Sequence, residues 1–132
     1  MTLQVALVVP DRELWSGEAS IVIAKTTEGD IGVLTGHSPV FGLLAEGSLV
    51  EIRPAEGADQ SVTVTAAVSG GFLSVADDRV SVLAAQAQLS AEVDTGAAQS
   101  DLDSALAEAG AGTEEPADAK YARARLRAAG QA

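Results

Sequence analysis

Apolar and polar residues alternate along several short stretches of this sequence. In residues 3–9, for example, leucine or valine stands at every second position, and residues 62–68 repeat the pattern. Alternation of this kind indicates a β-strand with one buried face. Turn residues separate the stretches at a spacing of about 8–12 residues, which favours an antiparallel sandwich or barrel. The stretches are residues 3–9, 19–24, 40–44, 48–53, 62–68, 72–76 and 80–84.

The spacing of apolar residues changes near residue 87 and becomes that of helices. Ser90 is a favourable N-cap, and Glu92 and Asp94 would then lie in the first turn, where the helix dipole favours acids. Residues 120–129 would form a second, shorter helix. The apolar stripe expected on the first helix is Val93, Ala97, Ala98, Leu102, Ala105, Leu106 and Ala109.

These two patterns predict a mainly β protein with an α appendage. An antiparallel β-sandwich is expected over residues 1–87, and a two-helix hairpin over residues 88–132. The seam between the two helices consists mostly of alanine, which buries little area on packing. We therefore expect the hairpin to be a mobile appendage that needs a partner to hold it.

Charge is distributed unevenly along the chain. The sequence carries 19 acidic and 8 basic residues, and the resulting net charge of −11 opposes binding to nucleic acid phosphates. Residues 89–118 contain eight acids and no base, whereas residues 119–132 contain four bases and no acid. An acidic helix followed by a basic one suggests that the two can pair. No apolar run approaches the roughly 20 residues that cross a bilayer, so direct membrane insertion is not expected.

Residues 28–39 are rich in turn-forming residues. Glycines at positions 29, 32 and 36 allow a positive φ or a close backbone approach, and Pro39 fixes the end of a turn. The segment therefore predicts an acidic turn, a short strand and a second turn. A loop whose glycines and proline fix its turns in this way is either a contact surface or a tight crossover between sheets. The sequence leaves both interpretations open.

Catalytic and metal chemistry has few candidates in this sequence. His37 is the only histidine and there is no cysteine, which excludes a tight histidine triad and a thiolate site. Glu28 and Asp30 flank a glycine, but two carboxylates alone make a weak cation site. The glycine pair at 70–71 has neither the spacing nor the following helix of a phosphate loop. An enzyme is therefore not expected, and no metal site is assigned.

Five groups of residues, taken together, resemble the epsilon subunit of bacterial F-type ATP synthases. The resemblance runs through the whole predicted sandwich, and the alanine-rich tail fits the same family. The groups are Pro10…Leu14-Trp15-x-Gly17-Glu18-Ala19, Glu28-Gly29-x-x-Gly32-x-Leu34-x-Gly36-His37-x-Pro39, Glu46-Gly47-x-Leu49-x-x-Ile52, Ser69-Gly70-Gly71-Phe72-Leu73-x-Val75 and Val80-x-Val82-Leu83-Ala84.

The resemblance implies a non-catalytic rotor subunit of the central stalk, which couples proton flow to ATP synthesis. In this family the sandwich binds the foot of the gamma subunit and the ring of c subunits. The helical hairpin modulates ATP hydrolysis at the alpha/beta catalytic head. The interface role maps onto Glu28, Gly29, Asp30, Gly36 and His37. The resemblance also implies a peripheral location on the cytoplasmic face of the cell membrane.

Some members of this family bind ATP on the hairpin through an Ile/Leu-Asp-x-x-Arg-Ala motif. The matching run here is residues 93–98, in which Ala97 stands in place of the arginine. Asp94, Arg123 and Arg127 remain as regulatory residues with at most a weak ATP contact, and no cofactor is expected. The alternative interpretation is a free-standing β-sandwich module that senses a nucleotide.

Overall fold

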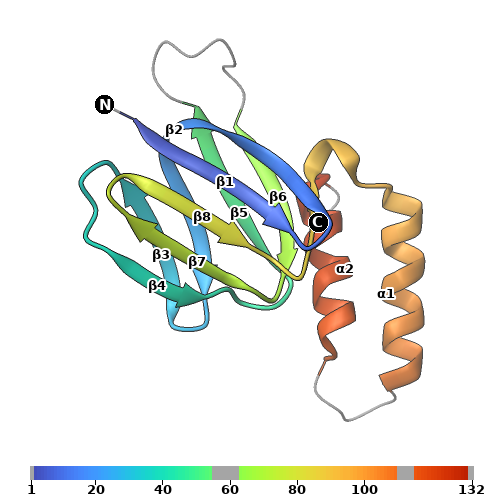
Figure 1. Ribbon diagram of the computed structural model, residues 1–132. Helices are drawn as coiled ribbons and strands as arrows, with labels where there is room; N and C mark the ends of the chain where they lie inside the picture. Colours follow the sequence, from blue (N-terminus) through green and yellow to red (C-terminus); the bar gives the residue numbers. More distant parts are fainter. Residues whose placement is uncertain (1, 55–62, 110–114, 131–132) are drawn as a thin grey trace.

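The computed structural model describes residues 2–54, 63–109 and 115–130, which form strands first and helices afterwards (Figure 1). The strands are β1 (Leu3–Val9), β2 (Arg12–Thr26), β3 (Gly29–Leu34), β4 (Val40–Leu43), β5 (Ser48–Pro54), β6 (Val64–Ser69), β7 (Phe72–Ala76), β8 (Arg79–Leu83) and β9 (Gln86–Leu89). The helices are the 3-10 turn η1 (Ser90–Glu92), α1 (Thr95–Ala109) and α2 (Ala117–Ala128). A mainly β fold with a helical appendage is confirmed.

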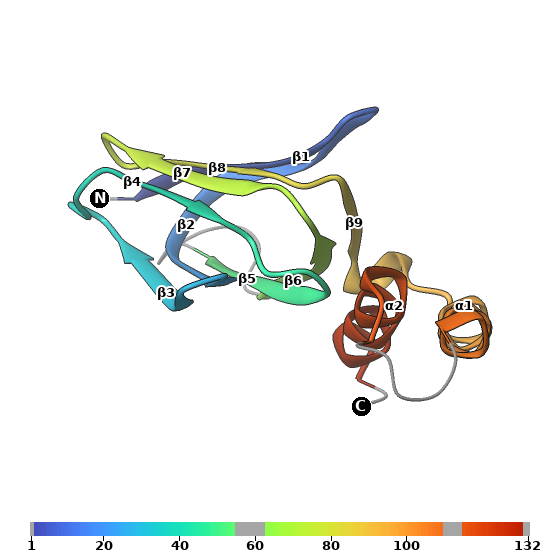
Figure 2. The same cartoon turned by 90° about the horizontal axis from the view of Figure 1, so that it is seen from below.

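The strands form one hydrogen-bonded sheet that folds into two facing layers (Figure 2). Their order is β4-β7-β8-β1-β2-β5-β6-β9, and β3 pairs with β2 beside this path. The predicted antiparallel sandwich is confirmed with one exception, because β1 and β8 run parallel. All the other strand pairs among the described residues are antiparallel.

Strand β2 joins the two layers. Its first half, from Arg12 to Ala19, pairs with β1, and its second half pairs with β3 on one side and β5 on the other. The sequence predicted the second strand over residues 19–24 only. In the structure only Pro10 and Asp11 form the turn, so a single strand of 15 residues follows.

The core lies between the layers and follows the predicted alternation. Leu3, Val5 and Leu7 of β1 are at most 3% exposed, while the residues between them face outward. In β6, however, Ala67 and Ser69 are buried as well as Ala66 and Val68. The prediction of one buried face for this strand is therefore wrong, because α2 covers the outer face of β6.

The junction between sandwich and helices differs from the prediction. Strand β9 pairs with β6, so the expected boundary at residue 87 falls inside a strand. The first long helix starts at Thr95 and not after Ser90. Its N-terminus is capped by Asp94, whose carboxylate accepts a hydrogen bond from the backbone N–H of Ala97 at 3.1 Å. Ser90 begins the short turn η1 instead.

The two helices pack side by side, and α2 lies between α1 and the sandwich (Figure 1). Their shared cluster consists of Leu102, Ala119 and Ala122, with Ala105 and Leu126 at its edge. The predicted stripe on α1 is too wide, because Leu106 is 39% exposed and Ala97 is also exposed, and Val93 precedes the helix. The tail, which the sequence predicts to be a mobile appendage, packs through α2 against β5 and β6.

Candidate interaction surfaces

The five predicted interface residues do not form one cluster. Glu28 and Gly29 lie at the start of β3, together with Asp30, whereas Gly36 and His37 follow the end of that strand. Six residues at about 3.3 Å each put roughly 20 Å between the two groups. The structure therefore divides the predicted interface into an acidic turn at one end of β3 and a second loop at the other.

The acidic turn, residues 27–30, is held in one conformation by its own hydrogen bonds. The hydroxyl of Thr26 donates to the carbonyl oxygen of Gly29 at 2.7 Å and accepts from the N–H of Glu28 at 3.2 Å. Gly29 has a φ of +130°, a value that side chains oppose. Glu28 and Asp30 are exposed on this turn, and Asp30 lies opposite Lys25 in the strand register. The turn thus presents carboxylates from a fixed backbone.

The second loop is tied to the neighbouring turn between β7 and β8. The N–H of Gly36, which has a φ of +81°, donates to a carboxylate oxygen of Asp78 at 2.6 Å. The N–H of His37 donates to the carbonyl oxygen of Leu34 at 3.1 Å. Asp77 and Asp78 both have positive φ, as a tight hairpin turn requires.

An exposed apolar face lies on the outside of β4, β7 and β8, and it was missed from the sequence. Phe41 is 64% exposed, Leu43 57% and Leu83 37%. The rings of Phe41 and Phe72 stack with their centroids 4.8 Å apart. Leu43, Phe72 and Leu83 stand opposite one another in register across the three strands. We call these four residues the apolar face.

The apolar face and the acidic turn are neighbours in space. A surface hollow is lined by Thr26, Thr27 and Glu28 on one side and by Phe41, Gly42 and Leu43 on the other. A backbone hydrogen bond from Thr27 to the carbonyl oxygen of Leu43, 2.9 Å long, joins the two segments. An apolar surface with carboxylates at its rim is therefore the most distinctive feature of the sandwich exterior.

The three residues predicted as regulatory or weak ATP contacts each bind a different partner within the protein. Asp94 caps α1, as described above. Arg123 forms an ion pair with Glu115 at 2.6 Å, on the surface of the hairpin. Arg127 donates to the carbonyl oxygen of Gly47 at 3.1 Å, where α2 meets the sandwich. All three side chains are therefore engaged in contacts within the chain.

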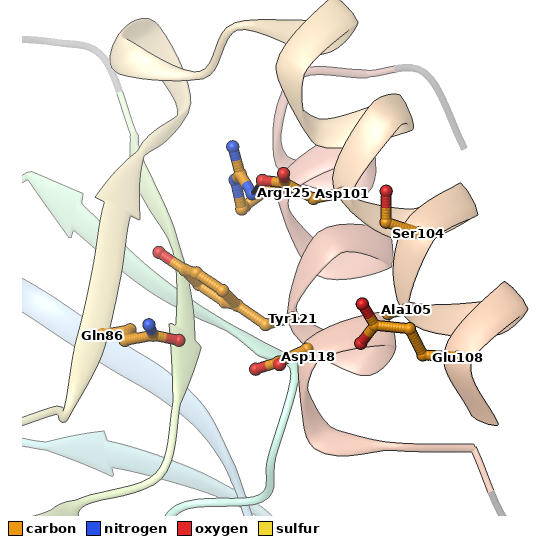
Figure 3. Close-up of a pocket in the computed structure, with 8 residues that line it drawn as sticks. All are labelled: Gln86, Asp101, Ser104, Ala105, Glu108, Asp118, Tyr121 and Arg125. Carbon is orange, nitrogen blue, oxygen red and sulfur yellow. Dashed lines mark hydrogen bonds and ion pairs between the residues drawn. The ribbon is translucent and has the colours of Figure 1, made fainter.

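A hollow between α1, α2 and β9 is more acidic than a phosphate site would be (Figure 3). Of the described residues, Asp101, Glu108 and Asp118 line it, together with one cation, Arg125. Arg125 already donates from Nη1 to Asp101 at 2.7 Å. Burial raises the pKa of Tyr121 beside it, and the charge of Arg125 partly opposes that rise.

Comparisons with known proteins agree on one family. The β-sandwich domain of the ATP synthase delta/epsilon chain matches residues 2–90. An ATP synthase epsilon chain from Streptomyces coelicolor is 50% identical over 127 residues, which cover 96% of this chain and 94% of that protein. The chain belongs to the ATP synthase epsilon chain family. The epsilon chain of Thermobifida fusca is 52% identical over 128 residues, covering 96% of this chain and 91% of that one.

Solved structures with the same fold come from within ATP synthases. A chain in the cryo-EM structure of the Euglena gracilis mitochondrial ATP synthase (OSCP, F1 and c-ring) superimposes with a TM-score of 0.69. The alignment covers 98% of this chain and 78% of that one at 23% identity, so it shows a shared fold. A chain from the central stalk and c-ring of the Tetrahymena thermophila enzyme gives 0.54 at 22% identity, covering 70% of each chain.

Membership in the epsilon chain family confirms the resemblance found in the sequence. It also confirms that the chain is a non-catalytic subunit of an ATP synthase. It places the chain in a membrane-associated complex. Neither helix in the described part of the chain is long and apolar enough to span a bilayer.

Proposed function

We propose that the chain attaches to the foot of the gamma subunit through the apolar face and to the c-ring through the acidic turn. The apolar face carries the proposal. Phe41, Leu43, Phe72 and Leu83 form a contiguous patch, and soluble monomers rarely leave such a patch uncovered. Aromatic side chains are enriched at the buried centre of protein interfaces. In a subunit of a larger complex, this face is the natural surface for the largest contact.

The acidic turn suits a contact of a different kind. Glu28 and Asp30 are exposed on a backbone fixed by the Thr26 hydroxyl, so they can meet basic loops without further ordering. Because the turn borders the apolar face, one docking event can engage both surfaces. Contact with the c-ring would hold the chain at the cytoplasmic face of the cell membrane as a peripheral subunit. The free-standing nucleotide sensor is the weaker alternative, because relatives match almost the whole chain.

The first experiment removes the apolar face. We expect the double variant Phe41→Ser, Leu43→Ser to bind isolated gamma subunit at least tenfold more weakly, because a few well-packed residues near the centre of an interface carry most of its binding energy. Co-purification and calorimetry measure the affinity. Leu106→Ser is the matched control, since Leu106 is also an exposed leucine but lies on α1. Unchanged binding of the double variant would remove this face from the interface.

The second experiment reverses one charge on the acidic turn. We expect Asp30→Lys to reduce ATP-driven proton pumping in membrane vesicles. The stability of the sandwich should change by no more than about 0.5 kcal/mol, as for other surface substitutions. Asp103→Lys makes the same change on the exposed surface of α1 and serves as the control. Normal pumping and assembly with Asp30→Lys would show that the turn does not contact the ring.

We also propose that the hairpin regulates ATP hydrolysis without holding ATP. The arginine of the family motif is replaced by Ala97, Arg123 and Arg127 are engaged elsewhere, and the hollow between the helices is acidic. We expect no ATP binding below about 1 mM by calorimetry, and submillimolar binding would contradict the proposal. We expect the complex to hydrolyse ATP faster when residues 91–132 are deleted. An unaltered rate would show that the hairpin is not a brake.

A further inference from the structure

Arg125 contacts three elements at once. Its side chain, on α2, is only 10% exposed. Nη1 donates to a carboxylate oxygen of Asp101 on α1 at 2.7 Å, and Nε donates to the side-chain oxygen of Gln88 on β9 at 2.8 Å. The guanidinium also lies 5.4 Å from the centroid of the Tyr121 ring, a cation–π distance (Figure 3). One buried cation therefore holds α2 both to its partner helix and to the sandwich.

Gly47 brings the sandwich backbone against α2 at a second point. It stands in the turn before β5 with a φ of +60°. A Cβ atom at this position would overlap the backbone carbonyl group of Lys120, so only glycine allows the helix to lie where it does. The carbonyl oxygen of Gly47 also accepts the hydrogen bond from Arg127 at 3.1 Å. The docked position of α2 thus depends on the absence of a side chain on the sandwich.

We propose that Arg125 and Gly47 form a latch that makes closing the hairpin and docking it onto the sandwich a single event. If α1 moved away alone, Arg125 would lose Asp101 while it stayed buried beside Gln88. If α2 left the sandwich alone, Arg125 would lose Gln88. Loss of Asp101 would leave a buried cation without its ionic partner, and loss of Gln88 would free the guanidinium that is held in place for Asp101, so each contact reinforces the other. The hairpin is consequently either closed and docked on the sandwich, or open and released from it.

The latch describes how the proposed regulation would work, and its biological role rests on that proposed function. The coupling between the helices and the sandwich is a property of the isolated chain alone. A failure of the latch would therefore leave the gamma and c-ring tests unaffected, and a failure of those tests would leave the latch standing. Gly47 lines one hollow with Asp30 of the acidic turn, so the separation rests on the variants of Arg125, Asp101 and Gln88. The contacts of these three residues join α1, α2 and β9.

The test measures amide hydrogen exchange, by mass spectrometry, in the full isolated chain. We expect Arg125→Gln to speed exchange in α1 and α2 together by at least tenfold, with the core strands β1, β7 and β8 unchanged. The control is Arg123→Gln, the same substitution on the same helix at a residue whose ion pair is exposed. Less than about threefold change is expected there, because exposed pairs contribute little.

Two milder variants test the two hydrogen-bonded contacts of Arg125 separately. Asp101→Asn removes the negative charge from the α1 contact alone, and Gln88→Ala removes only the β9 contact. Coupling predicts that Asp101→Asn speeds exchange in α2 and in β6 beneath it, and that Gln88→Ala speeds exchange in α1. Effects confined to α1 in the first variant and to α2 and β6 in the second would overturn the proposal.

Gly47→Ala tests the second contact. We expect it to release both helices, because the added methyl group overlaps the backbone of Lys120. Gly70→Ala is the matched control: Gly70 has a similar φ of +70°, but its added Cβ would meet only the Cβ of Ala85 at an ordinary 3.5 Å. Both variants carry the same left-handed strain, so release by Gly47→Ala alone supports the latch. Release by both or by neither contradicts it.

Discussion

The sandwich and the hairpin bury different kinds of side chain. The largest fully buried residues are all leucine, isoleucine or valine, and all lie in strands. In the described part of the hairpin, the buried residues of the cluster are one leucine, Leu102, and two alanines, Ala119 and Ala122. Full burial of a valine or leucine side chain stabilises a fold by about 1.5–3 kcal/mol, whereas one methyl group contributes about 0.8 kcal/mol. The sandwich is thus held by apolar packing, whereas the hairpin depends on a few polar contacts that other polar partners can replace.

The largest expected effect is on the sandwich core. We expect Leu73→Ala, at a fully buried position in β7, to reduce the free energy of unfolding by about 2–5 kcal/mol. Leu102→Ala makes the same change in the hairpin, where it should release the helices and leave the sandwich transition almost in place. Urea unfolding followed by circular dichroism measures both. Equal losses of sandwich stability would show that the two parts form one cooperative unit.

A smaller effect is expected when the hairpin is removed. We expect residues 1–90 to fold cooperatively, because every strand is retained. A fragment that ends at residue 87 should be less stable by about 1–2 kcal/mol, since it loses the pairing of Gln88 and Leu89 with β6. Thermal melts of both fragments measure the difference. A non-cooperative melt of the longer fragment would contradict a separately folding sandwich.

Salt should affect the two parts differently. Arg123 pairs with Glu115 at an exposed site, and the Asp101 partner of Arg125 is itself 61% exposed. Exposed pairs contribute about 0–1 kcal/mol and are screened at about 1 M salt. We expect amide exchange in α1 and α2 to rise a few-fold between low and about 1 M sodium chloride, while the sandwich strands stay constant. Equal exchange at both salt concentrations would show that apolar packing, and not charge pairing, holds the hairpin on the sandwich.

The smallest effect concerns Tyr121, the only tyrosine. Burial raises its pKa when the hairpin is docked, so the folded protein holds the phenol proton more tightly than the released form does. Docking is therefore fully stable below the usual tyrosine pKa of about 10 and weakens as the pH rises above it. Absorbance at 295 nm measures the titration. In Arg125→Gln, release predicts a fall toward the usual value, whereas a hairpin that stays docked without the arginine charge predicts a further rise.

Much of the sandwich could be predicted from alternation alone. Strands β1 and β5, and the turn at Asp77, follow from residues whose local preference and tertiary environment agree. Strand β9 was missed because Gln86 to Leu89 carries too little apolar alternation to stand out. The helix start was misplaced because Ser90 and Asp94 are both good caps. The structure selects Asp94, and β9 and η1 occupy the residues before it.

The candidate surfaces were harder to predict. Gly29 and Gly36 were grouped because they are close in sequence, but an extended strand between them carries them apart. Phe41 and Phe72 are ordinary core residues by composition, and only the strand register turns them outward. The burial of Arg125 has no sequence signal, since it depends on three elements that converge from distant positions.

The crossing of β2 from one layer to the other has a mechanical consequence. Its 15 residues are hydrogen-bonded to β1 near one end and to β3 and β5 near the other. Sliding one layer over the other would therefore have to break ladder hydrogen bonds in shear or stretch a covalent backbone. A sandwich whose two layers are joined only by side-chain packing resists such sliding less. For the proposed function, this strand makes the body between the two proposed contact surfaces torsionally stiff, so that elastic twist is expected to accumulate outside it.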